Sequence, residues 1–361
     1  MFVAIRDVRF ARGRFALMGA VVTLITLLVV LLSGLTAGLG RGNTSAITDL
    51  PADHLVLSAP APGTKLAFTD SSLPPSVRAQ WSDVPGVTRV EPVAVSMSRA
   101  EAAGRTAGVA VFAVPPGSTL APAVGVGRVV LSSKAAHTIG AAVGDRVVVG
   151  GRAVTVAAVG DDAEFSHAPV VWAADADAPV SGQPAGNATF LALTTDPATL
   201  DPAALDTTDR RLGTVTLTPA ESLSAIGSYT SENGSLQLMR ALLFAISALV
   251  IGAFFTVWTV QRSGEIAILK ALGASTTYLL KDALGQALVL LAIGTTLGAA
   301  LAAGIGAAVT GLSGAAVPFV LDLSTLLVPA AVMVAIGLAG AAVSLRTVTT
   351  VDPLTALGSA R

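Results

Sequence analysis

Four apolar runs, each long enough to cross a lipid bilayer as a helix, constrain this chain more than any other feature of its sequence. They span residues 16–39, 236–260, 284–309 and 326–345. A helix needs about 20 apolar residues to cross the hydrocarbon core of a membrane. With 53% hydrophobic and only 12% charged residues among 361, the chain is also too apolar for a soluble protein of this length. The sequence therefore predicts a membrane protein with four spans.

The first apolar run follows a basic segment at residues 1–15. This segment holds four arginines among Phe2, Ile5 and Phe10, which fits either an amphipathic helix in the inner headgroup layer or a frayed basic leader. A cleaved signal peptide is the competing interpretation, because arginines precede the run and small residues follow it. The apolar core of a signal peptide is only about 7–15 residues long. We therefore expect the run to remain as the first span.

Basic residues beside the runs predict the orientation of the chain. Four arginines precede the first run, three basic residues follow the second (residues 261–280 and Lys281), two lie in the tail at 346–361, and none lies at 310–325. Short cytoplasmic segments of membrane proteins carry the excess of Lys and Arg. We therefore expect a plasma-membrane protein with both termini and residues 261–280 in the cytoplasm, and with the loop 310–325 outside.

Residues 40–233, between the first two runs, form the predicted extracellular domain. Strand patterns, bounded by Gly-rich turns, occur at residues 128–133, 145–151 and 152–160. A short helix followed by a Pro-Gly turn into a strand is predicted from residue 74 onward. Residues 173–208 are rich in Ala, Asp, Pro and Thr with weak periodicity, and we expect a loop-heavy insertion there. The predicted fold class is an α+β membrane protein with a large mixed α+β extracellular domain between transmembrane helices 1 and 2.

The third run carries small residues at four-residue intervals. They are Gly294, Gly298, Ala302 and Gly306. In lipid, apolar side chains gain little by leaving their surroundings, and a small-residue ridge lets another helix approach closely. Chance spacing in an Ala-rich and Gly-rich chain is the alternative. We expect this ridge to be a helix-packing surface.

The composition excludes several classes of function. The 22 basic and 23 acidic residues give no electrostatic support for a nucleic-acid partner, and the absence of cysteine excludes disulfides and thiolate chemistry. No phosphate-binding loop of the G-x-x-x-x-G-K-[ST] type occurs, so we expect ATP to be hydrolysed on a partner chain. The spacing of His54, His137 and His167 is not typical of a hydrolase or zinc site. Asp161, Asp162, Glu164 and His167 could hold a divalent cation in principle, but such acidic loops are usually only solvated. We expect no intrinsic metal or cofactor.

The start of the second run offers candidate substrate contacts on one face of a helix. At about 100° per residue, one arc contains Tyr229, Glu232, Leu236, Met239, Arg240, Leu243 and Ser247. An arginine that faces lipid is costly, although near a helix end it can snorkel to the headgroups, which is the alternative interpretation. If the arc lines a cleft between two protomers, it suits haem, because Glu232 and Met239 could ligate iron and Arg240 could pair with propionates. The candidate substrate-binding residues are Tyr229, Glu232, Leu236, Met239 and Arg240.

The connector that begins at Gln261 has the pattern of a short amphipathic helix. It reads QRSGEIAILKALGAS, with Glu265 in the first turn, Lys270 later and a turn at Gly273. A cytoplasmic helix tied between two spans could receive a push from a soluble partner and pass it to both. An ordinary polar connector is the alternative.

The connector and the tail resemble a known family. The run from Arg262 to Ala274 is similar to the coupling-helix motif of permeases in the MacB and FtsX superfamily, and Asp352-Pro353-Leu354-Thr355-Ala356-Leu357 is similar to that family's C-terminal pattern. The basic first segment and the stretches WSDVPGVTRVEPV and VGDDAEFSHAPVVW are similar as well. The resemblance covers most of the chain and implies a homodimer, with two copies of a cytoplasmic ABC ATPase that bind ATP and Mg²⁺. It also implies the ATPase-coupling residues Arg262, Glu265, Ile266, Leu269, Lys270, Leu272 and Gly273.

Within that superfamily, a four-span permease with an outer domain of this size looks most like the haem-exporting type. The expected function is extrusion of a hydrophobic or amphipathic substrate, haem first, from the membrane. A histidine-ligated haem in the membrane is not expected, because no histidine lies in a span and His54 follows the first run by some fifteen residues. One alternative is an FtsX-like mechanotransmission protein that regulates a cell-wall hydrolase. Another is a lipoprotein or peptide exporter, which would have a broad apolar outer cavity.

Overall fold

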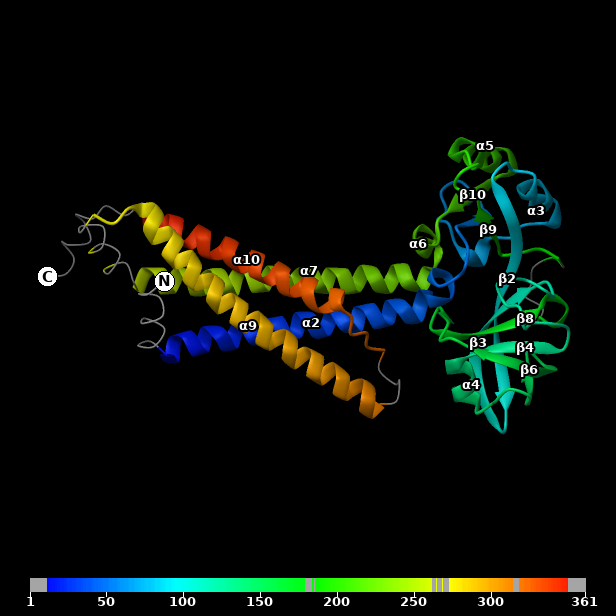
Figure 1. Cartoon of the computed structure of the whole chain (residues 1–361), viewed down its shortest axis with the longest axis horizontal. Coiled ribbons are helices and arrows are strands. Elements are labelled where there is room, and N and C mark those ends of the chain that lie inside the picture. Colours follow the sequence, from blue (N-terminus) through cyan, green and yellow to red (C-terminus); the bar gives the residue numbers. More distant parts are fainter. Residues whose placement is uncertain are drawn as a thin grey trace. The chain divides into compact units, whose positions relative to one another are not determined.

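The computed structural model divides the chain into two compact units, which are described separately. The helical unit comprises Met1–Gly38 and Gly234–Arg361, and the sheet unit comprises Leu39–Asn233 (Figure 1). The described residues are 12–178, 184, 186–261, 264, 268, 273–313 and 318–349. The predicted fold class is confirmed, because a mixed α/β sheet domain lies in the chain between the first and second long apolar helices.

Long apolar helices make up the described part of the helical unit. They are α2 (Arg12–Thr48), α7 (Gly227–Gln261), α9 (Thr276–Ser313) and α10 (Leu323–Thr349). All four are long and apolar enough to cross a membrane. All four extend beyond their apolar runs, because backbone hydrogen bonding continues through polar residues that lipid would exclude. The last turns of α2 and the first turns of α7 therefore belong to the sheet unit.

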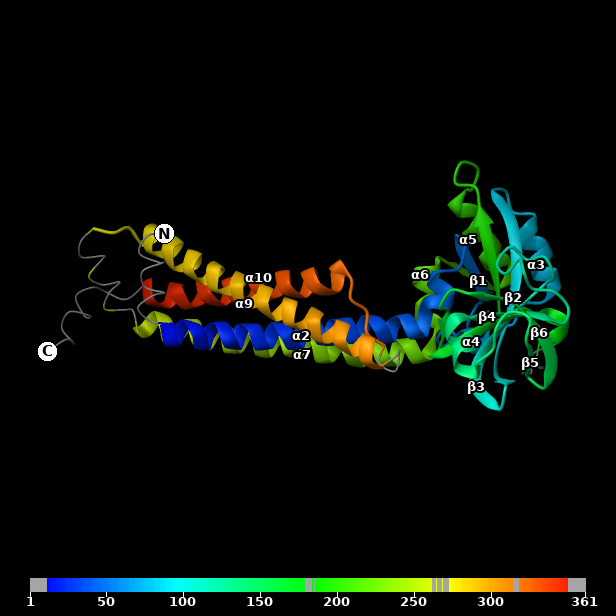
Figure 2. The same ribbon diagram turned by 60° about the horizontal axis from the view of Figure 1, so that its bottom comes forward.

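The predicted small-residue ridge on α9 is confirmed as a packing surface. A Cβ added to Gly298 would lie 2.6 Å from the backbone oxygen of Thr23, and one added to Gly294 would lie 2.7 Å from a methyl of Val22. Ala302 is fully buried, and Gly306 contacts the ring of Phe319. Both views place α9 across α2 (Figure 2). A larger residue at Gly294 or Gly298 would therefore force α9 and α2 apart.

The longest strand of the sheet unit, β2, pairs with β9 along its first half and with β3 and β5 along its second half. The strands are β1 His54–Ser58, β2 Val87–Ala102, β3 Arg105–Val114, β4 Arg128–Ser132, β5 Arg146–Val149, β6 Arg152–Gly160, β7 Glu164–Phe165, β8 Ala168–Ala174, β9 Phe190–Thr195 and β10 Thr214–Leu217. Their order is β10-β1-β9-β2-β3-β8-β4-β6-β5, and β7 pairs with β8. β5 also pairs with β2, so the strands from β2 to β5 along this order close into a ring. Closure removes the exposed edge that β5 would otherwise present.

Alternating side chains fill this ring, as the strand patterns predicted. Its buried core includes Val109, Val111, Val129, Leu131, Val147, Val149, Val154, Val156 and Val171, together with Ala135, Ala136 and Ile139. The last three come from helix α4 (Ser133–Ile139). Its N-cap is Ser132, whose hydroxyl accepts a hydrogen bond from the Ala135 N–H, and its C-cap is Gly140 in the left-handed conformation. Residues two apart on a strand share one face. The predicted strands at 128–133, 145–151 and 152–160 are confirmed.

An aromatic core lies on the other face of β3. Phe68, Phe112, Phe165 and Phe190 pack edge to face, with ring centroids 5.6 to 6.3 Å apart. Ala46, Ile47 and Leu50, from the end of α2 and just beyond it, pack into the same core. Burying an aliphatic or aromatic side chain contributes roughly 1.5 to 3 kcal/mol. This core therefore fixes the end of α2 against the sheet, close to β7 and β8.

The expected loop-heavy insertion at residues 173–208 is wrong. This stretch contains β9, which lies between β1 and β2, and most of α5 (Pro202–Leu212). β9 reads FLALTT, and Phe190, Leu191, Ala192 and Leu193 are all buried. A strand covered on both faces reads as a short apolar run without alternation, which removes the periodic signal. The remaining short helices are η1 Phe68–Asp70, α3 Pro75–Ser82, η2 Asp175–Asp177, α6 Pro219–Ser222 and η3 Leu223–Ala225.

Candidate functional site

Three segments of the sheet unit bring four polar side chains together. Asn43 comes from the last turns of α2, His167 from the turn between β7 and β8, and Ser228 and Glu232 from the first turns of α7. We call these four residues the polar junction. They are brought together because α2 packs on the aromatic core and Tyr229, beside Ser228, packs on the same core.

The carboxylate of Glu232 lies at the centre of the polar junction. The Asn43 amide donates to its Oε2 at 2.9 Å, and the His167 Nε2 lies 2.9 Å from Oε1 and 2.8 Å from Oε2. The same two nitrogens are 2.8 Å apart, because both converge on one carboxylate. Ser228 donates its hydroxyl hydrogen to the Asn43 Oδ1 at 2.6 Å. Hydrogen bonds to an ionised acceptor are among the stronger ones in proteins, so this network holds Glu232 in one position.

The turn that carries His167 has an unusual backbone. Ser166 and His167 have φ angles of 50° and 63°, and β7 pairs with β8 on either side of them. Two-residue hairpin turns with positive φ at both positions strongly prefer Asn-Gly, so a Ser-His pair is costly there. The turn is held by α2, since the Ser166 N–H donates to the carbonyl of Asn43 at 3.1 Å and the His167 N–H to that of Gly42 at 2.9 Å. A strained turn with external support is a candidate functional element.

The polar junction combines one buried amide, Asn43, with two side chains that reach solvent. Asn43 is only 1% exposed, whereas the side chains of His167 and Glu232 are 37% and 40% exposed. Behind them, the mostly buried Glu164 pairs with Lys134. Because the imidazole and the carboxylate reach solvent and are held in place by the buried amide, they can donate or accept a proton. They can also ligate a metal ion that is part of a substrate.

The candidate substrate residues from the helix arc fall in both units. Tyr229 packs against the aromatic core, and Glu232 joins the polar junction. Leu236, Met239 and Arg240 belong to the helical unit, where Leu236 is half-buried, Met239 is exposed and Arg240 donates to the Gln237 side chain at 2.5 Å.

Most of the predicted coupling segment lies outside the described residues. Those positions are Arg262, Glu265, Ile266, Leu269, Lys270 and Leu272. Gly273 is described, and its φ of 93° confirms the predicted turn. Residues 1–11 and the tail motif at 352–357 also lie outside the described residues.

The four residues considered as a site for a divalent cation, Asp161, Asp162, Glu164 and His167, do not converge on one point. Glu164 pairs with Lys134, and His167 binds Glu232 instead. Within the described ranges, no three His, Asp or Glu side chains are arranged to hold a metal ion. The approach of His167 to Glu232 was missed, because 65 residues separate them. The sequence does contain one signal. A Ser-His pair between two short strand patterns is an unfavourable hairpin turn, which indicates that another segment must contact and stabilise it.

Comparison with known proteins gives two family matches and full-length relatives. The family described as MacB-like periplasmic core domain matches residues 15–210, more than half of the chain, and the family described as FtsX-like permease C-terminal matches residues 238–353. A Staphylococcus epidermidis protein provisionally named hemin transport system permease protein HrtB is 25% identical over 369 residues, covering 99% of each chain. An uncharacterized ABC transporter permease of Mycobacterium tuberculosis is 26% identical over 373 residues, again covering 99% of each chain.

Two solved structures also align with the chain. The periplasmic region of MacB from Actinobacillus actinomycetemcomitans aligns with a TM-score of 0.34 and 13% identity, covering 48% of this chain and 92% of that one. The extracellular domain of the ABC-type transporter YknZ from Gram-positive bacteria aligns with a TM-score of 0.33 and 12% identity, covering 45% of this chain and 98% of that one.

Proposed function

This chain belongs to the ABC transporter permeases of the MacB and FtsX type, and on that premise we propose that it is the membrane subunit of a haem efflux pump. In the proposed complex, two copies of this chain lie in the plasma membrane with their termini in the cytoplasm. Two copies of a separate ATPase bind ATP and Mg²⁺, because this sequence contains no phosphate-binding loop. The two ATPases contact residues 261–280. When they close on ATP, they move the transmembrane helices and so push the substrate outward.

The observation that carries this proposal is the meeting of His167 with Glu232. Glu232 was one of two iron ligands predicted from the helix arc, and the second group beside it is an imidazole 2.8 Å away. Haem iron accepts histidine nitrogen among several axial ligands. The named relatives from Staphylococcus support the same substrate, since they carry the name of hemin transport permeases.

The chemistry of the polar junction gives a specific binding step. The Nε2 of His167 ligates iron through its lone pair, so in the haem-bound state the neutral ring carries its one hydrogen on Nδ1 and Nε2 donates no hydrogen bond to Glu232. Asn43 still donates to Glu232 at 2.9 Å and keeps the carboxylate in place. We propose His167 as one axial ligand, with Glu232 beside the iron. The sequence separately predicted Met239 as an iron ligand and Arg240 as the partner of a propionate, and both residues belong to the helical unit.

A haem titration of the purified full chain in nanodiscs tests the proposal. We expect the haem absorption band to shift on binding, and His167→Gln and Glu232→Gln each to weaken binding by at least about tenfold, or 1.4 kcal/mol. The matched control is His137→Gln, since His137 is an exposed histidine on α4 of the same unit. No spectral shift with the wild-type chain, or equal affinities for all three variants, would reject haem as the substrate.

Coupling to the ATPase has a test of its own. Glu265→Lys reverses the charge in the first turn of the predicted coupling helix, where a cation opposes the helix dipole. We expect this variant to bind haem normally but to lose stimulation of the co-purified ATPase by haem. Normal stimulation would remove residues 261–280 from the proposed mechanism.

Mechanotransmission without transport is the second candidate function, and one observation favours it. α2 and α7 both extend from one unit into the other, and the polar junction ties the sheet-unit end of α2 to that of α7. Such a tie would let the two helices move the sheet unit together. This candidate predicts that Asn43→Leu abolishes the cellular activity of the complex even though the wild-type chain binds no haem.

A further inference from the structure

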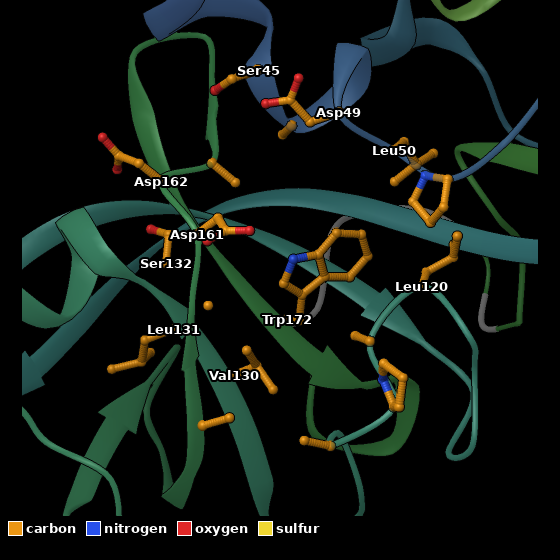
Figure 3. Close-up of a pocket in the computed structure, with 18 residues that line it drawn as sticks. Ser45, Asp49, Leu50, Leu120, Val130, Leu131, Ser132, Asp161, Asp162 and Trp172 are labelled. Atoms are coloured by element: carbon orange, nitrogen blue, oxygen red, sulfur yellow. The ribbon is translucent and has the colours of Figure 1, made fainter.

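The sheet unit contains a cleft that the proposed haem site does not use. It has a volume of about 340 Å³ and lies between the last turn of α2, the loop at residues 120–123 and strands β4, β6 and β8 (Figure 3). Ligand pockets in proteins range from about 300 to 1,000 Å³. The cleft is therefore large enough for one small molecule.

An aromatic side chain forms the middle of this cleft. The Trp172 ring lies there, between Leu120 on one side and Val130 and Asp161 on the other (Figure 3). Trp172 packs edge to face on Phe112, with ring centroids 5.1 Å apart, which fixes its orientation. Among the described residues, none accepts a hydrogen bond from the indole N–H of Trp172. The ring therefore offers both a π face and a free donor to a ligand.

Carboxylates lie around the aromatic wall. Asp49, Asp161 and Asp162 line the cleft and are exposed, and none of the described residues that line it is a Lys, Arg or His. The neighbouring cation, Lys134, is already paired with Glu164. The cleft thus concentrates negative charge in a chain whose net charge is only −1. A concave site of one sign focuses its electric field on ligands of the opposite sign.

The wall opposite α2 is rigid. The buried Glu91 accepts hydrogen bonds from the Ser118 hydroxyl at 2.9 Å, the Thr119 N–H at 2.9 Å and the Leu120 N–H at 3.3 Å. Its carboxylate therefore holds the loop that carries Leu120 into the cleft. A preformed wall lowers the entropy cost of binding, because no loop has to become ordered when the ligand arrives.

We propose that this acidic cleft binds a small organic cation with an aromatic or apolar body. The cationic group lies between Asp161, Asp162 and the face of Trp172, and the apolar body contacts Leu120 and Val130. Cation–π contacts and carboxylates together recognise ammonium groups. Haem carries anionic propionates, which the three carboxylates repel. The proposal is therefore independent of the haem site.

Benzyltrimethylammonium is a suitable probe, because it combines an aromatic ring with a permanent charge. We expect it to bind the full chain in nanodiscs of phosphatidylcholine, a lipid without net charge, as measured by saturation-transfer NMR. Benzenesulfonate, an anion of similar size, should not bind, and high salt should weaken binding of the cation. Asp161→Asn with Asp162→Asn should weaken binding by at least about tenfold, and Trp172→Leu should weaken it as well.

Asp206→Asn is the matched control, since Asp206 is an exposed aspartate on α5 away from the cleft lining. We expect this variant to bind the probe normally. Equal binding of the cation and the anion would overturn the proposal, and so would unchanged affinity in the double Asp variant. The double variant should titrate with haem like the wild type, so a failure here is distinguishable from a failure of the haem proposal.

Discussion

The polar junction and the acidic cleft use carboxylates in opposite ways within one unit. At the junction, Glu232 accepts hydrogen bonds from a buried amide and lies within reach of an imidazole. In the cleft, Asp161 and Asp162 are exposed, and the lining holds no cation among the residues that the structure describes. Partnered charges fix geometry, whereas charges without a cationic partner keep their field available to a ligand. Disrupting the junction should therefore lower stability, whereas removing the charges in the cleft should not.

We expect the largest effect on stability when Asn43, the buried amide of the polar junction, is replaced. Asn43→Leu removes the hydrogen bond from the Asn43 amide to Glu232 and the one that Asn43 accepts from the Ser228 hydroxyl. A typical hydrogen bond contributes about 1 kcal/mol, so we expect about 2 kcal/mol of lost local stability. Hydrogen exchange of the β7–β8 turn in the full chain measures this loss. Gln80→Leu replaces an exposed amide and should change little; equal effects of the two variants would contradict the assignment.

Two substitutions of His167 separate backbone strain from side-chain chemistry. Both His167→Gly and His167→Gln remove the imidazole, but only glycine adopts a φ of 63° without steric cost. We expect the glycine variant to be the more stable by about 1 kcal/mol, while both lose haem binding. Thermal unfolding and haem titration of the same samples measure the two effects. A glycine variant less stable than the glutamine variant would show that the turn is not strained.

Charge removal in the cleft should be harmless to stability. Asp161→Asn with Asp162→Asn removes repulsion between neighbouring carboxylates and breaks no described hydrogen bond of their side chains. We expect the melting temperature to stay within about 2 °C of the wild type or to rise. A clear loss of stability would mean that these carboxylates have a structural role and would remove the contrast with the junction.

We expect the smallest effect at Glu221. This residue has hydrogen-bond partners, as Glu232 has in the junction, but it is exposed, as the aspartates of the cleft are. Hydrogen bonds from the Thr218 N–H and hydroxyl lower the pKa of Glu221 below its ordinary value of 4.5. A lowered folded-state pKa contributes stability above the ordinary pKa, and this stability is lost as pH falls through the folded value. Thermal unfolding against pH should therefore show a slightly smaller acid-induced decrease in Glu221→Gln. An identical pH profile would mean that the cap does not stabilise the ionised carboxylate.

Local patterns predicted much of the fold. Apolar length located the four long helices, alternation located β4, β5 and β6, and the Pro85-Gly86 turn into β2 followed from its turn residues. The strand β9 was missed, because burial on both faces removes alternation. Closure of β5 on β2 was also not predictable, since the register between distant strands leaves no local signal.

The candidate site was only half visible in the sequence. Helical periodicity selected Glu232, because the arc lies on one continuous helix. His167 and Asn43 join it through the folding of segments that are 65 and 189 residues from it. The acidic cleft likewise combines the end of α2 with loops and strands far along the chain. One sequence can predict which residues share a helix face, but not which distant turn packs against that face.

The most direct test of the central claim is the electron paramagnetic resonance spectrum of ferric haem bound to the full chain. Axial ligands set the electronic state of haem iron, so the account predicts a spectrum that changes in His167→Gln and not in His137→Gln. Identical spectra for the wild type and His167→Gln would contradict ligation by the polar junction.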